Sequence, residues 1–235
     1  IGHSISPTFQ QAAFDQLGLA IRYQLWATPP EQLVTRISDI SEQRMLGANV
    51  TVPHKEAVLP LLDNIDGLAQ RIGAVNTIVN RGGILSGYNT DSRGFIRACQ
   101  TDGKLDLKNK RVFILGAGGA ARAVSFGLID EAVASLTLCN RTLSRAEALA
   151  TALKLDAGAS QTEITVLPWG SDAGKSDIVV NTTSIGMAGG KDPTISPVDS
   201  NHIHDHMVVC DLVYNPAETL LIKSAREAGA AVLTG

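Results

Sequence analysis

Short apolar runs and amphipathic stretches alternate along the second half of this 235-residue chain. Runs of four or five mostly apolar residues are typical of buried strands, and apolar residues three or four apart are typical of helices. Strands that alternate with helices imply right-handed crossovers and a parallel sheet. We expect strands at residues 111–115, 135–139, 163–167, 177–180, 208–212 and 230–233, and helices at 119–128, 143–153 and 220–228.

The first half of the chain has a mixed pattern. Ser6 followed by Pro7 is typical of a helix N-cap and the first helical residue. Two short apolar runs joined by Arg81-Gly82-Gly83 predict a hairpin. We expect helices at residues 6–17, 30–41, 55–62, 68–72 and 93–100, and strands at 21–27, 49–52, 74–79 and 84–87.

Residues 101–110 separate the two patterns. The segment is polar, with lysines and aspartates close together. Few contacts cross between domains at such a linker. We therefore expect a smaller α/β domain over residues 1–100 and a second domain over residues 101–235.

Composition and charge narrow the class of protein. Hydrophobic residues make up 44% and charged residues 18%, which is enough to bury a core. The net charge of −3 gives no basic surface for nucleic acid, and no apolar run reaches the roughly 18 residues of a membrane span. The cysteines Cys99, Cys139 and Cys210 lie far apart, as reduced thiols of a cytoplasmic protein do. The chain opens without Met and stops at Gly235 after an apolar run, so we expect it to be trimmed at both ends.

A glycine-rich turn, Gly116-Ala117-Gly118-Gly119-Ala120-Ala121-Arg122, follows the first predicted strand of the second domain and opens a helix. The first glycine permits a tight turn, the second lets the backbone approach a pyrophosphate, and the small Ala121 lets helix pack on strand. The free N–H groups at the helix start attract the anion. The alternative is a plain glycine-rich turn. The motif predicts a Rossmann-type, doubly wound dinucleotide-binding domain.

The second predicted strand of this domain indicates which dinucleotide binds. It ends at Leu138-Cys139-Asn140-Arg141-Thr142, without the carboxylate that usually holds the ribose of NAD. Arg141 can pair with the 2′-phosphate of NADP and stack on adenine, and Asn140 and Thr142 can add hydrogen bonds. The alternative for Arg141 is a solvated residue at a helix start. We expect NADP.

Three stretches of the first half combine polar groups that can bind a small polar substrate. They are His3-Ser4-Ile5-Ser6-Pro7, residues 49–55, and Gly87-Tyr88-Asn89-Thr90-Asp91. Taken singly, Ser6 is better explained as a helix cap, Lys55 as a solvated charge and Asp91 as a turn residue.

Taken together, these stretches resemble the shikimate dehydrogenase family. Seven motifs occur in order along the whole chain. They are His3-Ser4-x-Ser6-Pro7, Asn49-Val50-Thr51-Val52-Pro53-x-Lys55, Gly73-Ala74-Val75-Asn76-Thr77, Gly87-x-Asn89-Thr90-Asp91, the glycine-rich turn, Asn140-Arg141-Thr142 and Asn181-Thr182-Thr183. The resemblance implies reversible reduction of 3-dehydroshikimate to shikimate with NADPH, on the path through chorismate to aromatic amino acids.

The resemblance also implies roles for individual residues. Lys55 and Asp91 would form the catalytic pair, in which Lys55 donates a proton to the carbonyl oxygen and Asp91 orients the same hydroxyl. The implied substrate-binding residues are Ser4, Ser6, Thr51, Lys55, Asn76, Asp91 and Tyr214. The implied cofactor-binding residues are Gly116, Ala117, Gly118, Gly119, Ala120, Asn140, Arg141, Thr142, Thr182, Thr183, Met187, Leu212 and Gly235.

The chain departs from the family pattern in three places. It has Gln10 where the family often has His. By the same resemblance, we expect two segments to be missing from the 235 residues: the first strand of the substrate domain, and the C-terminal helix that returns to this domain with a substrate-contacting glutamine. Two alternatives stay open: a quinate/shikimate dehydrogenase of relaxed substrate or cofactor preference, and a non-catalytic homologue. The serine pair and the Asn89-Thr90-Asp91 motif argue against a folate-type methylene dehydrogenase. The histidines 202, 204 and 206 could share a strand face, but we expect a solvent-exposed loop and no metal. The expected partners are the small-molecule substrate and a second copy of this chain, with which it would form a homodimer.

Overall fold

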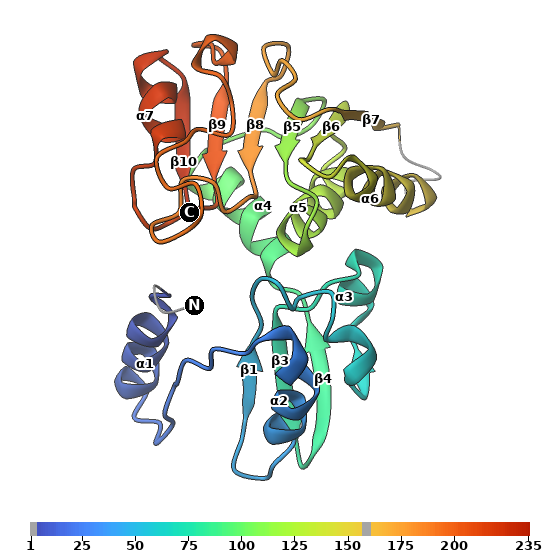
Figure 1. Cartoon of the computed structure of the whole chain (residues 1–235), viewed down its shortest axis with the longest axis vertical. Helices are drawn as coiled ribbons and strands as arrows, with labels where there is room; N and C mark the ends of the chain where they lie inside the picture. The colour runs from blue at the N-terminus through green and yellow to red at the C-terminus, as the bar shows by residue number, and fades with distance from the viewer. Residues whose placement is uncertain (1–3, 157–160) are drawn as a thin grey trace.

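The computed structural model describes residues 4–156 and 161–235, so that His3 of the first motif lies outside it. The described chain forms two sheets, drawn in the lower and upper parts of Figure 1. Helix α4 (Asp91–Thr101) joins them. Among the described residues, no helix has both the length and the apolar character needed to cross a membrane.

The upper sheet has six parallel strands in the order β10-β9-β8-β5-β6-β7. If its strands are numbered along the chain, this order is 6-5-4-1-2-3, that of a doubly wound dinucleotide-binding domain. The predicted α/β fold is therefore confirmed. The strands are β5 (Arg111–Leu115), β6 (Ser135–Cys139), β7 (Glu163–Leu167), β8 (Ile178–Asn181), β9 (Val208–Asp211) and β10 (Ala231–Thr234).

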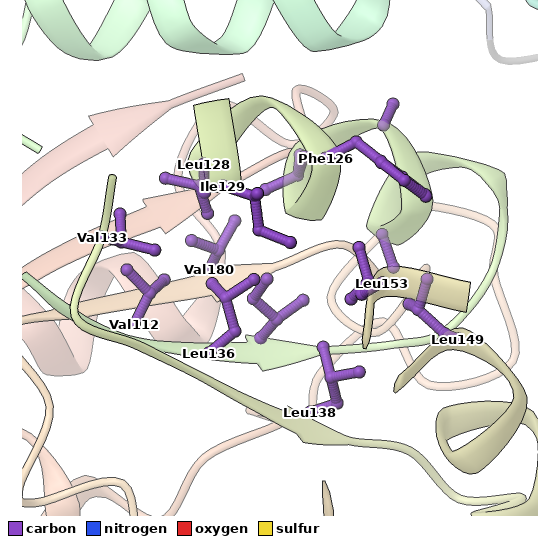
Figure 2. Close-up of a cluster of buried hydrophobic side chains, with 14 of the residues drawn as sticks. Val112, Phe126, Leu128, Ile129, Val133, Leu136, Leu138, Leu149, Leu153 and Val180 are labelled. Carbon is purple, nitrogen blue, oxygen red and sulfur yellow. The ribbon is translucent and has the colours of Figure 1, made fainter. Parts of the chain in front are cut away.

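Helices pack on this sheet and form its core. They are α5 (Gly119–Asp130), α6 (Leu143–Asp156) and α7 (Leu220–Glu227). Figure 2 shows Leu128 and Ile129 of α5, Leu136 and Leu138 of β6, and Leu149 and Leu153 of α6 in one cluster of buried side chains. A large-to-small substitution in such a core costs about 2–5 kcal/mol. This packing fixes the start of α5 against the carboxyl end of β5, where the predicted dinucleotide turn lies.

The lower sheet has four strands in the order β1-β3-β4-β2. The antiparallel hairpin of β3 and β4 is the predicted one, and its turn is Gly82-Gly83, with φ of +64° and +93°. Only glycine adopts two such successive conformations readily. The elements of this part are β1 (Gly47–Asn49), β2 (Asn64–Ile65), β3 (Thr77–Arg81), β4 (Ile84–Tyr88), α1 (Ser6–Gln16), η1 (Pro30–Gln32), α2 (Leu33–Ile40), η2 (Leu59–Leu61) and α3 (Gly67–Ile72).

The strand predicted at residues 21–27 is wrong. The side chain of Gln11, on α1, takes the place of a partner strand: its Nε2 donates to the oxygen of Ile21 at 2.9 Å, and its Oε1 accepts from the N–H of Tyr23 at 2.9 Å. The hydrophobic pattern could not reveal this pairing, because an amide side chain satisfies the backbone groups that a sheet would otherwise use.

The helix predicted at residues 55–62 is also wrong. The segment forms turns that end in the short 3₁₀ helix η2, in which Pro60 supplies no N–H donor. The strand predicted at 49–52 ends early, since β1 stops at Asn49. Helix α4 begins two residues earlier than predicted, at Asp91. The catalytic lysine of the prediction is therefore held by a turn, and the catalytic aspartate by a helix start.

An arginine of the lower part ties the two parts together. Arg71, in α3, donates to both oxygens of Asp130 at the end of α5 (2.8 and 2.7 Å) and to both oxygens of Asp156 at the end of α6 (2.7 to 2.9 Å). These bonds hold the pKa of Arg71 above its usual value. Bidentate contacts of this kind are the strongest form of ion pair on a protein surface. Arg71 thus fixes α3 against the ends of two helices of the upper domain.

Replacing Arg71 with methionine is expected to lower the free energy of unfolding by about 1 to 2 kcal/mol, because two neighbouring carboxylates lose their shared cation while the apolar stem stays. The midpoint of urea unfolding measures the change. Arg44→Met is the matched control, since Arg44 pairs with Glu42 at 2.8 Å on an open surface. An equal shift of the midpoint in both variants would show that the Arg71 contacts add nothing beyond an exposed pair.

Candidate active site

The predicted catalytic pair is assembled. Lys55 Nζ lies 2.6 Å from Asp91 Oδ2, with side-chain exposures of 14% and 29%. Lys55 lies in the turns that follow β1, and Asp91 is the first residue of α4, where the helix start favours a negative charge. A partly buried ammonium group beside a carboxylate can give up a proton and take it back, which suits the reduction of a carbonyl.

Two asparagines fix the position of Asp91. Asn76 Nδ2 donates to Asp91 Oδ1 at 2.7 Å and to Thr90 Oγ1 at 2.8 Å. The buried side chain of Asn89 accepts from the N–H of Asp91 at 3.0 Å and donates to the oxygen of Ala74 at 2.9 Å. Asn76 is a predicted substrate-binding residue and lies beside the pair. Asn89 belongs to one of the seven motifs, but its bonds to Asp91 and Ala74 could not be derived from one sequence.

The predicted serine pair is also in place. Ser4 Oγ lies 3.1 Å from Ser6 Oγ and accepts from the N–H of Ser6 at 3.2 Å. The expectation that Ser6 caps α1 is wrong, because Ile5 is the N-cap residue and no side chain caps that helix.

Tyr23 joins the serine pair to the end of β1. Its hydroxyl lies 3.1 Å from Asn49 Oδ1, and its partial burial raises its pKa, against a hydrogen bond with Ser6 that lowers it. None of the seven motifs includes Tyr23, and the apolar pattern around it predicts only a strand. Thr51 and Tyr214 are exposed, and within the described chain neither bonds to the catalytic pair.

The glycine-rich turn has the shape that a dinucleotide needs. Gly116 has φ of +112°, and a Cβ there would lie 2.4 Å from Thr182 Oγ1, so that no other residue fits. A Cβ at Gly118 would meet nothing within 4 Å, and no side chain caps the start of α5. The turn therefore leaves open space and free N–H groups where a pyrophosphate binds. Ala117 and Ala120 belong to the same turn.

Thr182 locks this turn to the end of β8. Its N–H and its hydroxyl both donate to the oxygen of Leu115, at 2.9 and 2.6 Å. The carboxyl ends of β5 and β8 are the point at which the strand order reverses, and ligands of doubly wound sheets bind there. These ends point toward the lower sheet in Figure 1.

The residues predicted to recognise the 2′-phosphate follow β6. Arg141 is exposed, and its Nη1 lies 3.5 Å from Asp192 Oδ2. Asn140 Nδ2 donates to the oxygen of Thr142 at 2.8 Å, which closes the turn around the arginine. Arg141 is thus free to exchange a weak carboxylate contact for a phosphate.

The remaining predicted cofactor residues lie on the loops after β8 and β9 and at the end of β10. Thr183 Oγ1 lies 2.7 Å from Asn181 Oδ1, and Met187 is 39% exposed. A Cβ at Gly235 would lie 2.7 Å from the oxygen of Leu212, so these two predicted residues are neighbours. The structure groups them at the carboxyl ends of the neighbouring strands β8, β9 and β10.

The predicted catalytic lysine packs directly against the start of α5. A Cβ at Gly119, the first residue of α5, would lie 2.8 Å from Lys55 Cβ and 3.2 Å from Lys55 Cδ. Beside it, Arg122 Nε donates to the oxygen of Ile72, and burial lowers the pKa of this arginine. Gly119 therefore sets how closely Lys55 approaches the start of α5.

Gly119→Ala is expected to lower kcat by about 10- to 100-fold, because the added methyl group displaces the rigid first carbon of the Lys55 side chain. Binding of adenosine 2′,5′-bisphosphate, followed by calorimetry, should change less than about threefold. Gly94→Ala is the matched control: it lies in α4 with nothing within 4 Å of a Cβ, and it should keep wild-type kcat. A wild-type kcat in Gly119→Ala would show that the lysine tolerates the displacement.

The three histidines do not share a strand. His202 ends the 3₁₀ helix η3 (Ser200–His202), and the rings of His204 and His206 stack at 5.7 Å in the turn that follows. Within residues 4–156 and 161–235, no group of three or more histidine, cysteine, aspartate or glutamate side chains is placed to hold a metal ion.

Comparisons with known proteins agree with this geometry. Residues 1–78 match the model of the shikimate dehydrogenase substrate binding domain, and residues 98–212 match that of shikimate / quinate 5-dehydrogenase. The shikimate dehydrogenase (NADP(+)) of Geobacillus sp. (strain WCH70) is 39% identical over 235 residues, which are 100% of this chain and 83% of the relative. That of Moorella thermoacetica is 44% identical over 240 residues, covering 100% of this chain and 79% of the relative.

A solved structure extends the likeness to three dimensions. The shikimate 5-dehydrogenase of Thermus thermophilus, in complex with NADP(H) and shikimate, has a TM-score of 0.86 and 37% identity, over 100% of this chain and 83% of that one. The glycine-rich turn lies within the second matched segment. This chain belongs to the shikimate dehydrogenase family.

Proposed function

We propose that this chain interconverts 3-dehydroshikimate and shikimate with NADP(H), and that Lys55 and Asp91 are its catalytic residues. The observation that carries the proposal is the 2.6 Å contact between Lys55 Nζ and Asp91 Oδ2, next to the start of the cofactor helix. The solved Thermus thermophilus relative, in complex with NADP(H) and shikimate, supports both ligands. In the reductive direction the product is the secondary alcohol.

When bound, NADPH supplies the hydride that reaches the carbonyl carbon. Lys55 donates its Nζ proton to the carbonyl oxygen, so that the alkoxide never carries a full charge. Asp91 accepts a hydrogen bond from Lys55 and holds the ammonium group toward the reacting oxygen. In the oxidative direction Lys55 takes the hydroxyl proton back. Asn76 keeps Asp91 in place through its 2.7 Å bond.

The substrate is held from two sides. Ser4 and Ser6 bind its carboxylate with their adjacent hydroxyls, and Thr51, Asn76 and Asp91 bind its ring hydroxyls. Tyr214, exposed on the loop after β9, approaches the substrate from the upper domain. The polar groups of Asn76 and Asp91 already lie within hydrogen-bond distance of each other, which supports a shared hydroxyl ligand between them.

The cofactor lies along the carboxyl ends of the upper sheet. The residues Gly116 to Ala120 hold the pyrophosphate, and Asn140, Arg141 and Thr142 hold the adenosine 2′-phosphate. The loops after β8 and β9, with the end of β10, hold the nicotinamide half through Thr182, Thr183, Met187, Leu212 and Gly235. The open turn at Gly118 and the exposed Arg141 side chain support this path.

The assay that tests the function follows absorbance at the NADPH band with shikimate and with quinate, each with NADP and with NAD. We expect turnover of shikimate with NADP, and at most slow turnover in the other combinations. Turnover of quinate with NAD alone would overturn the proposal in favour of a quinate dehydrogenase. An inert chain that binds NADP in a separate titration would be a non-catalytic homologue.

We also place the domain boundary between residues 100 and 101, at the end of α4, and propose that the enzyme works in the cytoplasm as a homodimer. The polar segment after α4 supports the boundary. The free, buried thiols of Cys99, Cys139 and Cys210 suit a reducing compartment. Sedimentation of the chain measures the assembly, and a single species at the monomer mass of 24.7 kDa would contradict the dimer.

A further inference from the structure

A buried carboxylate lies at the base of the two loops that follow β8 and β9. Asp211, the last residue of β9, is 1% exposed. Its Oδ1 accepts from Asn181 Nδ2 at 2.9 Å and from the N–H of Val213 at 3.0 Å, and its Oδ2 accepts from Thr219 Oγ1 at 2.6 Å. Burial raises the pKa of Asp211, against these hydrogen bonds, which lower it. Burying a carboxylate costs free energy, so the presence of Asp211 in this network needs a physical explanation.

The first donor shapes the loop after β8. Asn181 is fully buried, and its Oδ1 accepts from both the N–H and the hydroxyl of Thr183, at 3.0 and 2.7 Å. The hydroxyl of Thr183 in turn accepts from the N–H of Ile185 at 3.1 Å. The path of this loop up to Ile185 is therefore set by a side chain that Asp211 holds.

The other two donors shape the loop after β9. The N–H of Val213 fixes the turn that leads to Tyr214. Thr219 caps α7 by accepting from the N–H of Ile222 at 3.3 Å, and its side chain packs on Gly186, where a Cβ would lie 3.3 Å away.

The two loops also bond to each other. The N–H of Ala188 donates to the oxygen of Asn215 at 2.8 Å. One carboxylate thus ties together two loops and a helix start.

We propose that Asp211 is a positioning residue for hydride transfer. It holds the loop with Thr183 and Met187 and the loop with Leu212 and Tyr214 in a fixed position around the nicotinamide half of the cofactor. This inference rests on the proposed function. Asp211 is buried and acts only through Asn181, Val213 and Thr219. The groups proposed for the adenosine 2′-phosphate, Asn140 to Thr142, follow β6, and in the described chain none of them bonds to Asp211 or to its three donors.

The test compares two ligands in the Asp211→Asn variant of the full chain. NADP carries the nicotinamide, and adenosine 2′,5′-bisphosphate does not. Calorimetry is expected to show that the Kd of NADP rises about tenfold while that of the bisphosphate stays within about twofold. The kcat for shikimate should fall about 10- to 100-fold, because a small displacement of the reacting groups has effects of that size.

Two further variants keep the inference falsifiable. Thr219→Val removes one donor and leaves the carboxylate unchanged. It should raise the ratio of the NADP Kd to the bisphosphate Kd, but by less than Asp211→Asn does. This variant keeps the test available if Asp211→Asn fails to fold. Asn80→Ala is the matched control. Asn80 is a buried amide of the lower domain that donates to the oxygens of Ile40, Glu42 and Met45, so its loss should lower stability and leave the ratio unchanged.

The outcomes separate the possible failures. If the Asp211 and Thr219 variants lose only thermal stability, as Asn80→Ala does, the positioning role is wrong. If both ligands weaken equally, the network supports the whole domain rather than the nicotinamide half, and the inference is overturned as well. If the wild-type chain fails to oxidise shikimate with NADP, the proposed function fails, whereas the ratio of Kd values still decides the role of Asp211.

Discussion

Replacing Lys55 with methionine is expected to lower kcat for shikimate oxidation by about 10²- to 10⁴-fold, the range for loss of a general acid or base. Methionine keeps the apolar stem that packs on Gly119, so the fold should persist. The variant loses the ammonium group, 2.6 Å from Asp91, that carries the transferred proton in the proposed mechanism. Steady-state kinetics at saturating NADP measure the change.

Lys55→Arg separates proton transfer from charge. A guanidinium keeps the positive charge and the contact with a carboxylate, but it does not release a proton near neutral pH. We expect it to be nearly as slow as the methionine variant. Titration with NADP should give a Kd within about threefold of wild type for both. Lys110→Met, at an exposed lysine, is the control. A near-normal kcat in Lys55→Arg would mean that charge alone, and not a proton, is what the site requires.

The upper domain could be predicted almost completely from the sequence. Its central strands β5, β8 and β9 are buried on both faces, so each is a short apolar run. The glycine turn after β5 is required by a backbone conformation that only glycine adopts readily. The lower domain was harder to predict. Its strands are short, and the segment 21–27 bonds to the Gln11 side chain in place of a strand. A hydrophobic pattern does not distinguish these two partners.

The groups that connect distant segments could not be predicted from spacing. Arg71 meets Asp130 and Asp156, which lie 59 and 85 residues away along the chain. Asp211 meets Asn181, 30 residues away, at the ends of neighbouring strands. Each residue alone is a common type in a common place, and only the folded topology brings them together. Lys55 and Asp91 could be predicted as a pair because both lie in motifs of the family. The spacing between them, taken alone, does not indicate that they meet.

We expect the choice between NADP and NAD to depend on Arg141, an exposed arginine with a weak partner. Arg141 is 60% exposed and its Nη1 lies 3.5 Å from Asp192 Oδ2, too far for a strong ion pair. A 2′-phosphate can accept two short hydrogen bonds from one guanidinium group. Such a bidentate contact is much stronger than the single 3.5 Å contact with Asp192. The arginine should exchange its carboxylate for the phosphate when NADP binds.

Arg141→Ala is therefore expected to lower kcat/KM with NADP by about 10- to 100-fold, since a hydrogen bond to a charged group contributes about 1.5–3 kcal/mol. With NAD, which has no 2′-phosphate, kcat/KM should stay within about twofold. Asp192→Asn is the matched counterpart: it removes the competing carboxylate and should leave NADP binding equal or about two- to threefold tighter. Equal losses with both cofactors in Arg141→Ala would show that the arginine contacts adenine rather than the phosphate, and the preference for NADP would then need another source.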